Sequence, residues 1–221
     1  MCGRFALKAS PKSIQEHFHL PEIPALAPRY NVAPSQEIAV VRHFLQDPFP
    51  RLDMLRWGFI PSWAKDIKIG YKMINARGET LAQKPAFRTS YKKRRCLVVA
   101  DGFYEWSHAG SRKQPFFIRL KSNDVFAFAG LWDTWHNPDG SIIESCAIIT
   151  TSANELVGKI HDRMPVILQP EHYAVWLQDK AREESLQLLL VPYPARAMEA
   201  YRVSNVVNSP QNDTPSCLKP I

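Results

Sequence analysis

The chain has 221 residues, of which 45% are hydrophobic, so it can bury the core of one full domain or of two small ones. Its net charge is +7, which suits an anionic partner, nucleic acid before a membrane surface, although plain solubility explains the charge equally well. No apolar run reaches the roughly 18 residues of a membrane-spanning helix, so we expect no membrane partner.

The cysteines are too far apart to form a recognisable metal or disulfide motif. They are Cys2, Cys96, Cys146 and Cys217. Without a C-x-x-C pair, neither a structural zinc site nor a secreted disulfide scaffold is expected. The first residues include several basic ones and no apolar stretch, so no secretory leader is predicted. The sequence therefore predicts a reduced, cytoplasmic protein that holds no metal, and that reaches the nucleoid if it acts on DNA.

The predicted elements begin with a helix at Pro11, with Ser10 before it and with Ile14 and Phe18 on one face. Residues 21–36 are rich in proline and predicted to be extended. Runs of β-branched and aromatic residues then predict strands at 37–44, 52–57, 96–100, 115–120, 125–130, 145–151 and 165–168.

Turn and helix signals fill the second half. Residues Asn137–Gly140 predict a tight turn between two strands. The capping-box pattern Ser152–Glu155 predicts a helix through about Ile160. Pro170 opens a further helix through about Lys180, and 181–190 is a candidate third.

The ratio of these elements predicts the fold class. Strands outnumber helices and do not alternate with them, which is typical of an α+β domain and not of a doubly wound sheet. We expect a single domain over 2–208, with a mixed, mostly antiparallel β core and flanking short helices. The polar tail 209–221 is expected to be loose.

Cys2 is the most informative residue for chemistry, because removal of Met1 would give it a free α-amine beside its thiol. An aldehyde condenses with such an amine to a Schiff base, and the thiol then closes a thiazolidine ring. The reference amine pKa of about 7.7–8.0 leaves a large neutral fraction near neutral pH, unlike that of lysine at about 10.4. The alternatives are an incidental cysteine behind a retained Met1, or a small buried hydrophobe.

Three polar clusters interrupt apolar surroundings and are candidate site residues. Asn75 and Arg77 offer an amide and a planar fork for phosphate, or simply begin a helix. Glu105 lies between Tyr104 and Trp106, where lost hydration would raise its pKa, unless it faces outward from a strand. His161 could move a proton near neutral pH, or could be a core histidine satisfied by backbone.

Basic and aromatic residues provide a weaker signal for single-stranded nucleic acid. A basic run spans 92–95, and Trp57, Phe59 and Trp63 are close together in the sequence. Charge for phosphates and flat rings for bases are what single-strand binding needs. A charge run is more often a solvated loop, however, and aromatic residues are more often core.

Taken together, several motifs resemble those of the SRAP (SOS response-associated peptidase) family, in order from Cys2 to about Asn208. They are Met1–Phe5, Arg29–Pro34, Trp57–Pro61, Asn75–Thr80, Gly102–Trp106 and His161–Pro165. The resemblance implies recognition of abasic sites in single-stranded DNA and a covalent thiazolidine cross-link between Cys2 and the abasic aldehyde. It also implies shielding of the lesion during the damage response, removal of Met1 by the protein itself, and no need for a cofactor.

The resemblance also implies roles for individual residues. Cys2 would be the nucleophile, Asn75 would position it, Glu105 would be a general acid and base, and His161 would donate the proton that opens the sugar. The residues implied to contact or line the DNA are Arg4, Asn31, Pro34, Trp63, Arg77, Thr150, Ser152 and Arg163.

Other functions compete with this interpretation. The protein could be an N-terminal cysteine peptidase, or a reader of a modified base that binds DNA without a covalent bond. The Schiff base could also progress to β-elimination, which would make the protein a weak abasic-site lyase. We expect it to act as a monomer.

Overall fold

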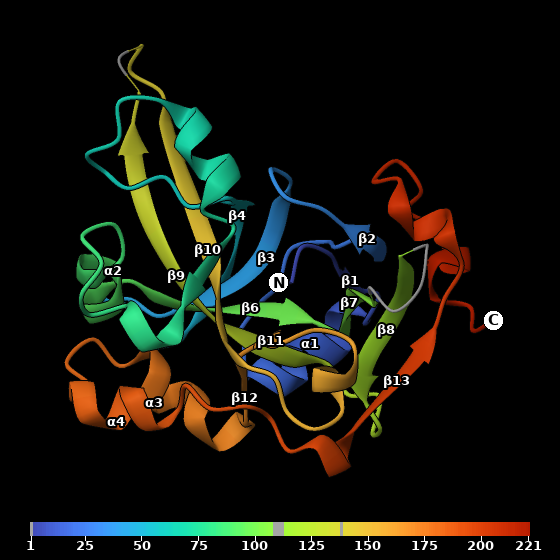
Figure 1. Cartoon of the computed structure of the whole chain (residues 1–221). Helices are drawn as coiled ribbons and strands as arrows, with labels where there is room; N and C mark the ends of the chain where they lie inside the picture. Colours follow the sequence, from blue (N-terminus) through green and yellow to red (C-terminus); the bar gives the residue numbers. More distant parts are fainter. Residues whose placement is uncertain (1, 108–112, 138) are drawn as a thin grey trace.

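Two β-sheets organise the residues that the computed structural model describes, which are 2–107, 113–137 and 139–221 (Figure 1). In the first sheet, β1 (Phe5–Leu7) lies one strand in from the edge and pairs antiparallel with both β2 (Arg29–Val32) and β7 (Gly102–Ser107). Its strand order is β13 (Met198–Arg202), β8 (Gln114–Leu120), β7 (Gly102–Ser107), β1 (Phe5–Leu7) and β2 (Arg29–Val32).

The second sheet closes on itself, because β9 and β10 pair with each other as well as with strands at opposite ends of the series β4–β3–β6. Its order is β11 (Arg163–Pro165), β10 (Ile142–Ser152), β4 (Arg51–Trp57), β3 (Glu37–Arg42), β6 (Arg95–Ala100), β9 (Phe126–His136) and β12 (Ile167–Leu168), with β5 (Asn75–Arg77) beside β10. Only the pairings of β10 with β4 and β5 are parallel among the described strands. The result is a small barrel-like sheet.

The helices are short and lie around these sheets. The α-helices are α1 (Pro11–Phe18), α2 (Arg88–Lys93), α3 (Tyr173–Leu177) and α4 (Glu183–Leu188). The 3₁₀ turns are η1 (Ile67–Lys72), η2 (Gly78–Thr80), η3 (Val157–Lys159), η4 (Pro170–His172), η5 (Ala195–Ala197), η6 (Asn205–Asn208) and η7 (Pro215–Leu218). No helix in the described part of the chain is long and apolar enough to cross a membrane.

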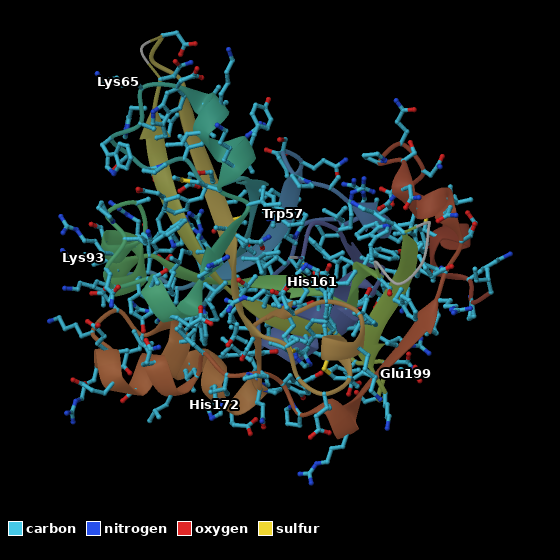
Figure 2. All side chains as sticks on the ribbon, in the orientation of Figure 1. Trp57, Lys65, Lys93, His161, His172 and Glu199 are labelled. Atoms are coloured by element: carbon cyan, nitrogen blue, oxygen red, sulfur yellow. The ribbon has the colours of Figure 1, made fainter. Side chains whose placement is uncertain are left out.

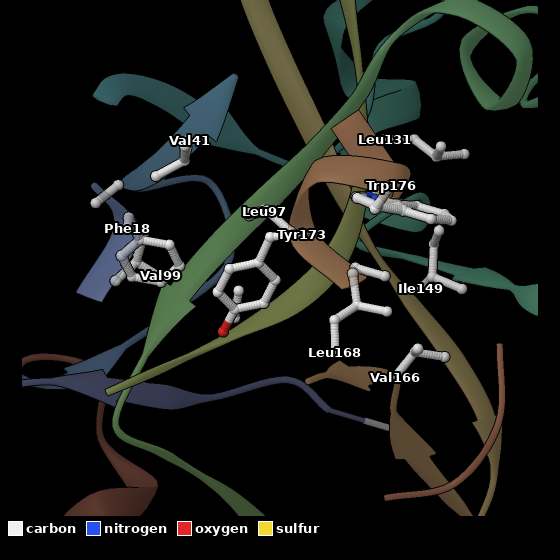
Figure 3. Packing of buried hydrophobic residues seen from close by; sticks show 14 of the residues in the cluster. Phe18, Val41, Leu97, Val99, Leu131, Ile149, Val166, Leu168, Tyr173 and Trp176 are labelled. Carbon is white, nitrogen blue, oxygen red and sulfur yellow. The ribbon is translucent and has the colours of Figure 1, made fainter. Parts of the chain in front are cut away.

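Two faces of β6 support two apolar clusters. Under α1 and α3, Phe18 and Tyr173 stack with ring centroids 5.3 Å apart, and Leu97 and Val99 of β6 belong to the same cluster (Figure 3). On the other side, Phe5 packs between the rings of Trp57 and Phe128, at 5.2 and 6.0 Å. Burial of this apolar surface provides most of the driving force for folding.

The predicted α+β class, with its mostly antiparallel core, is confirmed, and so are the predicted strands except 165–168, which is divided between β11 and β12. Differences lie mainly in length, since β9 and β10 both run well beyond the predicted 125–130 and 145–151. The predicted helix at Pro11 is confirmed, with the Ser10 hydroxyl accepting a bond from Ser13 N at 3.1 Å. The helix predicted from Pro170 begins as η4 and ends with α3, and the third candidate is α4.

The predicted helix at 152–160 is wrong. Ser152 is the last residue of β10, so it cannot be a helix cap. The side chain that supports the following turn is Asn154, whose Oδ1 accepts bonds from Leu156 N at 3.1 Å and Val157 N at 2.9 Å. Those bonds hold a single 3₁₀ turn, which ends before His161.

The expectation of a loose tail after Ser209 also differs from the structure. Asp213 accepts hydrogen bonds from Tyr30 N and Asn31 N, and Cys217 is fully buried. The segment is therefore fastened to β2 by its own side chains. In the predicted turn at 137–140, Pro138 lies outside the described residues, and Gly140 N donates to Asn137 O at 2.9 Å.

The end of β4 makes a very close backbone contact with η1. Gly58 has φ +136°, and a Cβ there would lie 2.8 Å from Gly70 O. A Cβ on Gly70 would in turn lie 2.7 Å from Gly58 O, so neither position has room for a side chain.

We therefore expect Gly58→Ala to lower the free energy of unfolding by about 2 kcal/mol or more, through steric overlap and backbone strain. Gly158→Ala is the matched control, because nothing lies within 4 Å of its Cβ position. Urea denaturation of both variants measures the difference. Equal stability of the two variants would contradict the close contact.

Candidate active site around Cys2

The position of Cys2 is set by the strand that follows it. Phe5 of β1 is opposite Val32 on one side and Phe103 on the other, and Tyr104 N donates to Arg4 O at 3.0 Å. These pairings carry the preceding residues into the interior, where Cys2 is fully buried in the cluster that contains Phe5. Cys2 therefore lies where the two sheets meet.

Asn75 contacts the backbone of Cys2 directly. It is on β5, opposite Ile148 of β10, and its Nδ2 donates to Cys2 O at 2.8 Å. Its Oδ1 is buried and has no hydrogen-bond partner among the described residues. The alternative that Asn75 begins a helix is wrong, because the residue belongs to a strand whose register β10 fixes. One side of its amide holds Cys2 while the other remains available as an acceptor.

Glu105 faces inward from β7, so the alternative of an outward-facing strand position is wrong. Its side chain is 2% exposed, between the buried Tyr104 and the half-buried Trp106. Burial raises the pKa of Glu105 from 4.5 to about 7, and the charge of Asp162 adds to the effect. A carboxyl group with this pKa can both give and accept a proton near neutral pH.

The Cys2 thiol is held in its neutral form. Burial raises its pKa well above the ordinary value, and the negative charge of Glu105 raises it further. The Sγ–H points toward Arg4 O at 3.8 Å. Because thiolate is the reactive form of cysteine, this thiol needs to lose its proton to a neighbour during the reaction. Among charged groups, Glu105 has the largest effect on the pKa of the Cys2 thiol.

His161 follows η3, and Figure 2 labels it near the middle of that view. Its Nδ1 accepts a bond from Arg163 N at 3.0 Å and lies 2.9 Å from Asp162 Oδ1. A neutral ring that accepts the Arg163 amide at Nδ1 carries its proton on Nε2, whereas a protonated ring donates from Nδ1 to Asp162 and also keeps a proton on Nε2. With a side chain 21% exposed, His161 is at the surface of the site rather than in the core.

Arg4 and Asn31 bind the C-terminal segment of the chain itself. Arg4 Nη1 donates to Asn31 Oδ1 and to Val207 O, both at 2.8 Å, and its Nη2 donates to Asn208 O at 3.1 Å. Asn31 has no exposed surface, and its Nδ2 is within 3.1 Å of Val207 O, Ser209 O and Asn212 O. Asn31 is thus not placed for the direct DNA contact that the family resemblance implies, and the Arg4 guanidinium is already engaged.

Arg163 and Thr150 are engaged as well. Arg163 forms a two-pronged pair with Glu79, at 2.5 and 2.9 Å, and its Nη2 donates to Thr150 O at 2.8 Å. Thr150 is fully buried, so the expected phosphate contact from its side chain is not available in this conformation. The pair with Arg163 also lowers the pKa of Glu79. Glu79 accepts two hydrogen bonds from the Arg163 guanidinium, as a phosphate would, and its sequence motif does not predict this role.

The remaining residues implied to contact DNA are accessible. Arg77 and Ser152 are exposed, Trp63 is 60% exposed and Pro34 is half-buried. The other two aromatic residues noted with Trp63 are fully buried.

Only half of the basic run 92–95 remains for a ligand. Arg95 is buried and donates to Trp176 O and Tyr91 O, and Arg94 pairs with Asp133 at 2.9 Å. Lys92 and Lys93 are exposed. The run therefore serves partly to hold α2 and α3 against β6.

The described residues contain no group of three or more histidine, cysteine, aspartate or glutamate side chains that could hold a metal ion. The site instead brings together four groups: the Cys2 backbone and thiol, the Asn75 amide, the Glu105 carboxyl and, through Asp162, the His161 ring. Such a set can move protons and hold an amine, a thiol and an electrophile in proximity.

Comparison with known proteins shows the family to which the chain belongs. The family model described as "SOS response associated peptidase (SRAP)" matches residues 1–210. The chain belongs to the SRAP family. It is 50% identical over 224 residues to the abasic site processing protein YoqW of Bacillus subtilis, covering 99% of each chain.

One more distant relative is also named an abasic site processing protein, and one solved structure has the same fold as this chain. The abasic site processing protein HMCES of Xenopus tropicalis is 30% identical over 266 residues, covering all of this chain and 78% of that protein. A crystal structure of a protein from Bacteroides thetaiotaomicron superposes with a TM-score of 0.88 at 28% identity, covering all of both chains. The α+β fold described above is thus the fold of this SRAP member.

The raised pKa of Glu105 predicts how stability depends on pH. A carboxyl group with a folded pKa near 7 and an unfolded pKa near 4.5 stabilises the fold most below pH 4.5. That contribution, about 3 kcal/mol at about 1.4 kcal/mol per pKa unit, is lost as pH rises through 7. Glu105→Gln lacks the titrating group, so wild type should lose stability relative to this variant between about pH 5 and pH 8. Urea denaturation at both values measures this, and parallel pH dependence of the two proteins would contradict it.

Proposed function

We propose that this SRAP protein recognises abasic sites in single-stranded DNA and binds them covalently through Cys2. The observation that carries the proposal is the buried Cys2, with its carbonyl held by Asn75 and its thiol beside Glu105. The relatives named abasic site processing proteins supply the substrate class. We infer that the protein shields the lesion during the DNA damage response, as a monomer in the cytoplasm and on nucleoid DNA.

Exposure of the α-amine of Cys2 comes first in the proposed sequence. Hydrolysis of the Met1–Cys2 amide by the protein itself would release methionine and leave the amine. The Asn75 Oδ1, buried and without a partner among the described residues, is available to accept an N–H of that amine. Its Nδ2 already fixes the adjacent carbonyl, so the amine would be formed in a defined orientation.

The amine then attacks the aldehyde carbon of the ring-opened abasic sugar. A C–N bond forms, the carbonyl oxygen takes a proton, and loss of water gives the imine. The His161 Nε2–H is suited to deliver the proton that opens the sugar, because Nδ1 is occupied by Arg163 N. Holding amine and aldehyde together replaces a bimolecular encounter by an effectively unimolecular step.

The thiol closes the ring in the last step. The Cys2 Sγ adds to the imine carbon, forming a C–S bond while the imine nitrogen takes a proton, which gives the thiazolidine. The thiol proton needs an acceptor because the Cys2 pKa is raised, and Glu105, with its pKa near 7, is suited to that task. The same carboxyl group would return the proton if the ring reopened.

Exposed residues beside the site would bind the DNA strand. Arg77 and Ser152 are exposed at the ends of strands beside the site, and Arg163 could exchange Glu79 for a phosphate. Phosphate contacts of this kind give affinity without reading sequence. Trp63 and Pro34 would provide apolar surface next to the abasic position, where the DNA strand lacks one base.

The raised pKa of Cys2 argues against a general cysteine peptidase. Such an enzyme attacks amides with a thiolate, which an opposite charge or a helix N-terminus normally stabilises. Here burial and the neighbouring carboxylate act in the opposite direction. The amine-first route does not need a preformed thiolate, so the same environment is compatible with cross-linking.

Cys2→Ala tests the covalent bond. Wild type mixed with a single-stranded oligonucleotide that bears one abasic site should give a heat-stable adduct on a denaturing gel, with the mass of a condensation product. Cys2→Ala, which keeps only the amine, should give no heat-stable adduct and some nicked strand by β-elimination. Cys217→Ala is the matched control, because Cys217 is equally buried but bonded to Asn212 O, and it should retain the adduct.

Two results would contradict the proposal. Absence of an adduct with wild type that has lost Met1 would leave a peptidase or a non-covalent DNA reader. Full adduct formation by Cys2→Ala would assign the bond to another residue.

Asn75→Ala tests the positioning of Cys2. Loss of one buried hydrogen bond costs about 1–3 kcal/mol, so the cross-linking rate at saturating DNA should fall about five-fold to a hundredfold. DNA affinity should change little, because Asn75 contacts the protein backbone rather than the strand. Single-turnover kinetics separate the two quantities. A variant with weakened binding and an unchanged rate would contradict this role.

A further inference from the structure

The segment that leads from β4 to β5 carries exposed residues that the proposed chemistry does not use. Tyr71 of η1 is 59% exposed, and Lys68 and Lys72 of the same turn are also exposed. Neither lysine has an ion-pair partner within 4.0 Å among the described residues. Their positive charge is therefore not neutralised by the part of the chain that the structure describes.

One face of the Tyr71 ring contacts a cation, the guanidinium of Arg56. The Arg56 guanidinium lies 5.6 Å from the centroid of its ring, and Arg56 Nη1 donates to Ser35 O at 3.1 Å. Arg56 Nε is buried without a partner among the described residues. We call the stacked pair of Tyr71 and Arg56, together with Lys68 and Lys72 of the same turn, the Tyr71 shelf.

The shelf is held rigidly. Gly58 and Gly70 pack backbone against backbone, and Phe59 N donates to Met73 O at 3.0 Å. The Asp66 side chain caps the turn by accepting from Lys68 N at 2.9 Å. An exposed ring on such a turn loses little conformational freedom when a flat partner stacks on it.

The shelf also lies close to Cys2. Tyr71 is four residues before Asn75, so about 14 Å of extended chain is the most that separates them. Asn75 in turn holds Cys2 O. On the other side, Val32 of β2 pairs with Phe5 of β1, and the Ser35 carbonyl that Arg56 binds follows Val32 by three residues. Figure 1 shows η1, in teal, beside the end of the β9–β10 hairpin, and Figure 2 labels Lys65 near the same end.

We propose that the Tyr71 shelf binds undamaged nucleotides of the strand a few positions from the lesion, with one base stacked on Tyr71 and phosphates at Lys68 and Lys72. This inference rests on the proposed function, since it extends the same strand beyond Cys2. An accessible ring on a turn that also carries two exposed lysines provides the stacking surface and the positive charge that sequence-independent single-strand binding requires. A lone exposed tyrosine would need no explanation, but here a stacked arginine and two unpaired lysines accompany it.

The test uses a labelled oligothymidylate about ten nucleotides long without an abasic site, which separates strand binding from covalent capture. By fluorescence anisotropy, Tyr71→Ala should weaken binding about five-fold or more, whereas Tyr71→Phe, which keeps the ring, should bind as wild type does. Changing Lys68 and Lys72 together to glutamine should reduce the slope of log Kd against log salt by about 1.4, since each single-strand phosphate contributes about 0.7.

Phe49→Ala is the matched control. Phe49 is 58% exposed, nearly as much as Tyr71. It lies at the loop end of the β3–β4 hairpin, where Arg42 pairs with Arg51, whereas Arg56 pairs with Glu37 at the opposite end. This variant should bind as wild type does. Equal weakening by Phe49→Ala and Tyr71→Ala, or no binding of the undamaged strand by wild type at low salt, would overturn the inference.

The two proposals can fail separately. If wild type cross-links an abasic site while Tyr71→Ala binds the undamaged strand as tightly as wild type does, only the shelf is wrong. If wild type binds the undamaged strand through Tyr71 but forms no adduct, the covalent function is wrong and the shelf remains.

Discussion

The complete burial of the second residue of the chain is the constraint on which the rest of the structure depends. Chain ends are usually exposed and poorly fixed, yet Cys2 is held by the strand pairs of β1 and by the amide of Asn75. Its surroundings then follow from ordinary electrostatics. A carboxyl group and a thiol in one dry pocket both favour their protonated forms, which leaves protons available where the proposed reaction needs to move them.

Much of the fold could be predicted from the sequence, because long strands record their burial as apolar runs. The strands β3, β4 and β6 were recognisable for this reason, whereas β1 and β5 have only three residues each and no measurable period. The helix expected after Ser152 failed because a capping pattern is local, and β10 extends through it. The pairing of β10 with its neighbours therefore outweighed the local capping pattern at Ser152.

The site residues divide in a similar way. Cys2, Asn75 and Glu105 come together as the motifs suggested, but Asn31 and Thr150 bind the protein rather than offering themselves to a ligand. A sequence motif indicates that a residue matters and does not say for what. Only the fold reveals that Arg4 is opposite the carbonyls of Val207 and Asn208, because no sequence period links positions about two hundred residues apart.

The contact between Arg4 and Val207 has a consequence for synthesis. Ribosomes add roughly 5–20 residues per second, so at least about ten seconds pass between the appearance of Arg4 and that of the carbonyls that complete its surroundings. Arg4 lacks these two hydrogen-bond acceptors during that time. The complete surroundings of Arg4, two residues after Cys2, therefore form only after Asn208 has been synthesised, so the first and the last parts of the described fold have to be present together before this contact exists.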